Sequence, residues 1–177
     1  MVGPDLSDRR RDELAKVFAE ADLEIKPLVA AMLQGDDFLA AIHSRARQPL
    51  EWVLGALQAL GFSSIAAAEV QPWTLRALGQ MPMAPPNVAG WPLDDRWTST
   101  SQIISRTNLL LNWHLPESTI NSVVPSVDAV LERCGIHHPS PSTRAALDHI
   151  EETISEFDYR LELLFVTALS SPEFTLL

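Results

Sequence analysis

Apolar positions recur at three- and four-residue spacing along most of the chain, a pattern that predicts amphipathic helices. Ser7 is the predicted N-cap of a first helix, and Pro27 is predicted to open a second helix that stops near Gly35. Pro49 and Pro72 are predicted to open two more. We find no alternating strand followed by a hairpin turn.

The second half of the chain continues the helical pattern, with capping residues before most apolar periods. The predicted helix starts are Thr98 or Ser99, Ser126, Ser140 and about residue 157. Together these segments predict an all-α, irregular bundle of about seven helices. We expect a single domain over residues 1–177, because this length suits one domain with a real core.

Residues 79–108 interrupt the helices with a long segment that is rich in proline and tryptophan. Ordering such a loop costs conformational entropy, so its own side chains must hold it. Pro86-Asn87 followed by Gly90 predicts a turn in which the Asn87 side chain bonds nearby backbone. We therefore interpret the segment as an ordered feature of the fold.

Two interpretations of this loop remain open. In the first it is a structural brace: its tryptophans fill the core, Arg106 reaches loop carbonyls, Asp94 or Asp95, and Asn108 helps to satisfy buried backbone groups. In the second the tryptophans form a platform for a sugar, a peptide or a partner chain. Both interpretations use the same candidate residues, which are Asn87, Trp91, Asp94, Asp95, Trp97, Arg106 and Asn108.

Motifs spread over nearly the whole chain also carry a family resemblance. They are Pro49-Leu-Glu51, Leu60-Gly61, Gly79-Gln80, Pro85-Pro86-Asn87-Val88, Gly90-Trp91-Pro92, Trp97, Arg106-x-Asn108 and Ser171-Pro-Glu-Phe174. With them the chain resembles the C-terminal portion of the bacterial family called domain of unknown function 1800. It departs from that family at Met83, where an aromatic is usual, and at residues 93–95, which replace a glycine-rich turn.

The resemblance implies no activity, since the family is uncharacterised, and the family's long N-terminal portion is missing here. Members often look exported and often sit beside a family with a sulfatase-like fold, which implies export and a protein partner. In this chain the arginines at 9–11 are followed by acidic residues rather than an apolar stretch. We find no signal peptide, so the chain as it stands is expected in the cytoplasm.

Charge and composition narrow the classes of partner. With 13 basic and 23 acidic residues the net charge is −10, which disfavours nucleic acid and anionic membrane surfaces. No apolar run approaches the roughly 20 residues of a membrane-spanning helix. Cys134 is the sole cysteine, so no intrachain disulfide forms. The oligomeric state stays open.

The sequence offers little catalytic chemistry. Cys134, His137 and His138 form the one metal-like cluster, but zinc sites use paired short motifs that are missing here. Asp94 and Asp95 are adjacent, which is typical of a solvated turn rather than of an acid–base pair. No nucleophile elbow or phosphate-binding glycine loop occurs. We expect no catalytic residues, no metal and no cofactor.

These observations favour a non-catalytic interaction or structural helical domain. The alternative is part of an exported enzyme or accessory protein that acts on polysaccharide or another polymer. In that alternative Trp91 and Trp97 line an open cleft together with Asp94 and Asp95. The burial of the two indole rings distinguishes the two hypotheses.

Overall fold

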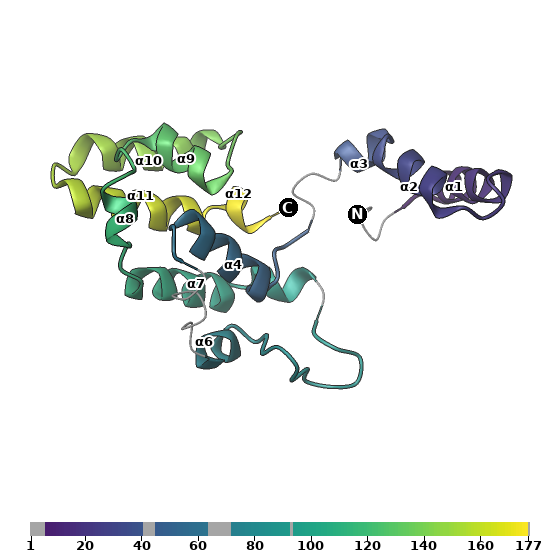
Figure 1. Ribbon diagram of the computed structural model, residues 1–177, viewed down its shortest axis with the longest axis horizontal. Coiled ribbons are helices and arrows are strands. Elements are labelled where there is room, and N and C mark those ends of the chain that lie inside the picture. The colour runs from purple at the N-terminus through teal and green to yellow at the C-terminus, as the bar shows by residue number, and fades with distance from the viewer. Residues whose placement is uncertain (1–5, 41–44, 64–71, 93, 177) are drawn as a thin grey trace. The chain divides into compact units, whose positions relative to one another are not determined.

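The computed structural model describes residues 6–40, 45–63, 72–92 and 94–176 (Figure 1). The prediction of an all-α fold is confirmed: the described residues contain eleven α-helices, one 3-10 helix and no strand. About seven helices were expected, and seven of the eleven have at least seven residues. The chain divides into two compact units, residues 1–45 and 46–177. The single domain over residues 1–177 stays a prediction.

The N-terminal unit holds α1 (Asp8–Glu20), α2 (Ile25–Leu33) and α3 (Asp36–Ala40). Ser7 caps α1 as predicted, since its hydroxyl accepts from the Arg10 N–H at 3.3 Å. The predicted start of the second helix at Pro27 is wrong: α2 begins two residues earlier, because proline is tolerated throughout the first turn. Arg10 joins the three helices by donating to the Ala31 carbonyl and pairing with Asp37.

The larger unit contains the remaining helices of the described chain. They are α4 (Pro49–Ala59), α6 (Pro72–Ala77), the 3-10 helix η1 (Asp94–Thr98), α7 (Thr100–Asn112), α8 (Glu117–Ile120), α9 (Val127–Cys134), α10 (Pro141–Thr153), α11 (Phe157–Ser170) and α12 (Pro172–Thr175). The predicted starts at Pro49 and Pro72 are confirmed. Ser126 and Ser140 cap α9 and α10 through their hydroxyls.

Helix α11 contributes to the core and packs against α7, α9 and α10 (Figure 1). Its buried residues are Leu161, Leu164, Phe165, Ala168 and Leu169. Trp52 of α4 is fully enclosed, and its indole N–H donates to the Leu169 carbonyl at 3.2 Å. A polar indole group buried in this way needs such an acceptor, which fixes α4 against the end of α11.

The C-terminal residues close the larger unit against the segment that precedes α4. The Arg47 N–H donates to the Thr175 carbonyl at 2.8 Å, beside an isolated antiparallel bridge between Ala46 and Leu176. Phe174 is buried edge-on against Trp52, with ring centroids 6.4 Å apart. The two ends of this unit are therefore held together by backbone hydrogen bonds and by an aromatic pair.

Candidate functional site

The start of the loop is fixed by a buried glutamine, Gln80. Its side-chain oxygen accepts from the Leu50 N–H at 2.9 Å, and its amide donates to the Gln48 side chain at 2.6 Å. Gln48 is the N-cap of α4, where Glu51 completes a capping box. One side chain thus ties the loop to the first turn of α4.

The end of the loop is fixed by Trp97 and by the first turn of α7. Trp97 is 3% exposed, and its indole N–H donates to the Pro92 carbonyl at 2.9 Å. Gln102 donates to the Leu78 carbonyl at 3.0 Å, from α7 to the residue after α6. Both ends of the loop are therefore braced by partly buried side-chain hydrogen bonds, which offset part of the entropy cost of ordering it.

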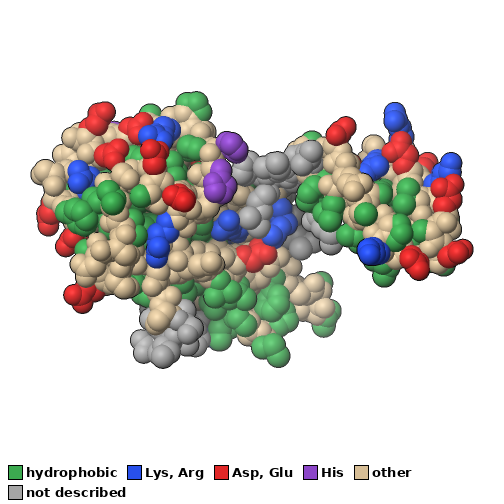
Figure 2. Space-filling view, turned by 45° about the horizontal axis from the view of Figure 1, so that its top comes forward, with side chains coloured by type: hydrophobic (Ala, Val, Ile, Leu, Met, Phe, Trp, Pro, Cys, Tyr) green, Lys and Arg blue, Asp and Glu red, His purple; other side chains and the backbone are tan. Residues whose placement is uncertain are grey.

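The middle of the loop is exposed and apolar. Met83 is 95% exposed and Val88 is fully exposed. Figure 2 shows hydrophobic side chains gathered at the lower edge of the larger unit, where the loop lies in Figure 1. The predicted turn is confirmed, because the Asn87 side-chain oxygen accepts from the Ala89 N–H at 2.9 Å. We call residues 81–92 the loop tip.

Two features of the loop tip are energetically unfavourable. Met83 has a φ of 63°, a left-handed conformation that residues with a side chain rarely adopt. Trp91 is half-buried and lines an open hollow of about 380 Å³ together with Asn87 and Arg96. Its indole N–H is shielded from solvent and has no hydrogen-bond partner among the described residues. A shielded donor without an acceptor destabilises the fold.

Arg106 does not brace the loop as expected. It is 2% exposed on α7, and it donates to the Arg47 carbonyl at 2.9 Å, outside the loop. Its guanidinium also lies 5.4 Å from the centroid of the Trp52 ring. Burial lowers the pKa of Arg106 to about 10, so the group is still charged at neutral pH. The expectation failed because the helical face that carries Arg106 meets α4 rather than the loop.

Asn108 is separated from Arg106, although only one residue lies between them. The Asn108 side chain is exposed, and within the described part of the chain it makes no hydrogen bond to the loop. Positions two apart on a helix point in different directions, so one loop cannot use both. Asp94 and Asp95 form the start of η1, and their side chains lie outside the described part of the structure.

The hydrogen-bonding residues at the loop base were missed by sequence reasoning. Gln80 was visible only as a member of the Gly79-Gln80 motif, and nothing in the local pattern marks Gln48 or Gln102. A neutral amide has no charge or spacing that reveals its partner, and these partners lie 30, 32 and 24 residues away. These hydrogen bonds can therefore be identified only from the tertiary structure.

The metal-like cluster around Cys134 shows no reactive chemistry. Burial raises the pKa of the Cys134 thiol to about 12, which leaves it protonated and unreactive. His137 and His138 are exposed. In the described residues no group of three His, Cys, Asp or Glu side chains is placed to hold a metal ion.

The geometry defines an all-α fold with a long loop that is braced at its base and apolar at its exposed tip. Residues 1–176 match the family model described as "Protein of unknown function (DUF1800)", so the chain belongs to this family. No curated protein and no solved structure matched the chain. Of the helices that the structure describes, none combines the length and the apolar character that crossing a membrane requires.

Proposed function

We propose that the chain is a non-catalytic protein-interaction domain and that the loop tip is its binding surface. The observation that carries this proposal is the exposure of Met83 and Val88 on a loop whose base is buried and hydrogen-bonded. Exposed apolar side chains on an ordered support are typical of interaction sites. A loop that is ordered before binding loses less entropy when a partner docks.

The local energetics of the loop tip support this assignment. The left-handed backbone at Met83 and the unpaired indole N–H of Trp91 both lower stability. Met83→Gly would remove the first of these penalties, and Trp91→Phe would remove the second. Backbone strain and unsatisfied polar groups concentrate at sites that serve function rather than folding.

The alternative role, a cleft that binds a polymer, fits the tryptophans less well. It needs both indole rings on an open surface, as in aromatic platforms that stack on a ligand. Trp97 is enclosed and hydrogen-bonded to Pro92, so only Trp91 borders the hollow. This arrangement favours a partner that buries the apolar tip over a polymer held between two tryptophans.

The partner that we propose is the sulfatase-like protein that the family resemblance implies. In the test, this partner is immobilised on a sensor, and the affinity of three chains for it is measured. The chains are the wild type, Val88→Ser and the control Val124→Ser. Both valines are exposed, but Val124 lies between α8 and α9, outside the loop. We expect Val88→Ser to weaken binding about tenfold, as loss of a central apolar contact does. Equal affinities for the two variants would overturn the assignment to the loop tip.

A further inference from the structure

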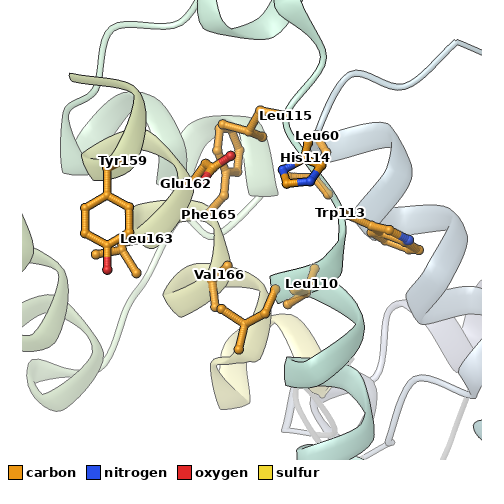
Figure 3. Close-up of a pocket in the computed structure, with 11 residues that line it drawn as sticks. Leu60, Leu110, Trp113, His114, Leu115, Tyr159, Glu162, Leu163, Phe165 and Val166 are labelled. Carbon is orange, nitrogen blue, oxygen red and sulfur yellow. The ribbon is translucent and has the colours of Figure 1, made fainter. Parts of the chain in front are cut away.

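A cavity lies in the larger unit, away from the loop tip. It is bounded by the C-terminal end of α7, by residues 113–115 and by α11 (Figure 3). Leu60, Leu110, Phe165 and Val166 provide apolar walls, and the first three of these are buried in the core. Its volume is about 130 Å³. The cavity is therefore part of the packed interior and also reaches the surface.

The volume of the cavity sets the size of an occupant. An apolar cavity of about 150 Å³ lined by Leu, Ile and Phe binds a benzene ring. The present cavity has nearly this size and a similar lining, so it suits one aromatic ring or one short branched chain. An apolar ring placed there would make dispersion contacts with the wall residues.

The surface end of the cavity sets the charge of an occupant. Figure 3 shows His114 and Glu162 on one side of the cavity, with Leu110 and Val166 on the opposite side. Neither His114 nor Glu162 has a hydrogen bond or an ion pair within the described residues, and no described Lys or Arg lines the cavity. Because no described Lys or Arg lines the cavity and His114 is the one basic side chain in its lining, the Glu162 carboxylate favours a cation, as does the chain's net charge of −10.

We propose that this cavity is a binding site for a small primary ammonium compound with an aromatic ring or a short branched chain. The ring occupies the apolar walls, and the ammonium group donates to the Glu162 carboxylate. Leu111 and Tyr159, which are 59% and 50% exposed, border the cavity and cover the bound ring from solvent. The site is independent of the interaction proposed for the loop tip.

The test uses the full chain and three probes of equal ring size: benzylamine, toluene and benzoate. Binding is followed by methyl chemical shifts in NMR titrations at neutral pH, where benzylamine is cationic. We expect benzylamine to bind about fivefold more tightly than toluene, in line with a partly exposed ion pair, and benzoate not to bind. Equal binding of benzylamine and benzoate, or no binding of benzylamine, overturns the proposal.

Two variants locate the site. Glu162→Gln should remove the preference for benzylamine over toluene while toluene still binds. The control Glu152→Gln, on the exposed surface of α10, should keep this preference.

Leu111→Trp should block the opening of the cavity and abolish binding of both probes. Its control is Ile104→Trp, seven residues earlier on α7 and similarly exposed. Unchanged binding of benzylamine and toluene to Leu111→Trp would overturn the site. Normal binding of benzylamine to Val88→Ser would show that the cavity is independent of the loop tip.

Discussion

At the scale of single residues, the two tryptophans of the loop differ in one hydrogen bond. The Trp97 indole N–H donates to the Pro92 carbonyl, whereas the Trp91 N–H is shielded from solvent and has no acceptor in the described structure. Each ring is partly or wholly buried, so its apolar surface contributes to stability in both cases. The polar atom of the ring stabilises the fold at one position and destabilises it at the other.

Replacement of each tryptophan by phenylalanine tests this difference. Trp97→Phe should lower the free energy of unfolding by about 1–2 kcal/mol, because it removes a buried hydrogen bond and part of a core ring. Trp91→Phe should change it by less than about 0.5 kcal/mol, since the lost ring contacts are offset by removal of an unpaired donor. Urea denaturation followed by circular dichroism measures both. Equal losses would contradict the assignment of hydrogen bonds.

Met83 allows a second test at the residue scale. A residue with a side chain in the left-handed conformation destabilises the folded state by about 1–2 kcal/mol. A new glycine also stabilises the unfolded chain through its entropy, by a somewhat smaller free energy. Met83→Gly should therefore raise the free energy of unfolding by about 0.5 kcal/mol. Met81 lacks a positive φ, so Met81→Gly is the control and should destabilise. Thermal melts of the two variants give the comparison. A lower melting temperature for Met83→Gly would exclude strain at this position.

At the scale of helices, Glu173 joins the start of α12 to the start of α10. Its carboxylate accepts from the Ser140 N–H at 2.7 Å and from the Thr143 hydroxyl at 2.9 Å. Partial burial raises the pKa of Glu173, but the hydrogen bonds from Ser140 and Thr143 outweigh it and lower the pKa to about 2. A negative charge is also favourable at the N-terminal end of a helix.

This carboxylate predicts a loss of stability in acid. Because the folded pKa lies below the ordinary value of 4.5, the contribution of Glu173 is complete above about pH 4.5 and is lost as the pH falls toward 2. Glu173→Gln should reduce the free energy of unfolding at pH 7 by about 1–2 kcal/mol, after allowance for solvent screening. Urea titrations from pH 7 to 2.5 should show the difference shrinking.

The control for this pH dependence is Glu152→Gln, which replaces an exposed carboxylate of α10. It should leave the free energy of unfolding within about 0.5 kcal/mol of the wild type at every pH. A constant difference between the wild type and Glu173→Gln from pH 7 to 2.5 would show that the carboxylate does not carry the effect.

At the scale of the whole molecule, the described residues form two units with unequal cores. The N-terminal unit has Leu14 as its one buried residue among those described; α1 packs against α2, and Arg10 of α1 bonds to α2 and α3. The larger unit has a continuous core around α11 and its own closure between Arg47 and Thr175. A unit with its own core and closure has the properties of an independently folding domain.

Removal of residues 1–44 tests this division. We expect the fragment 45–177 to unfold in one cooperative transition, with a melting temperature within about 3 °C of the full chain, because a change below about 1 kcal/mol shifts the melting temperature of a domain this size by only a few degrees. Differential scanning calorimetry measures both chains. A fragment that fails to unfold cooperatively would support the single domain predicted for residues 1–177.

The sequence by itself determined the helical class, most helix boundaries and the existence of an ordered loop. Helix periods and caps act over three or four residues, so the caps at Ser7, Ser126 and Ser140 were predictable from local pattern. The short elements α3, η1, α8 and α12 were not predicted, because four or five residues do not complete an apolar period. The turn at Asn87 was also predictable, since its acceptor and donor are two residues apart.

Only the tertiary structure decided what the loop residues do. It enclosed Trp97, left Trp91 without an acceptor among the described residues, directed Arg106 to a carbonyl 59 residues away and left Asn108 on the surface. It also formed the cavity from three segments that are distant in sequence. These outcomes depend on which helix faces pack against each other. Local periodicity predicts that a helix face is apolar, but it does not predict which other face will cover it.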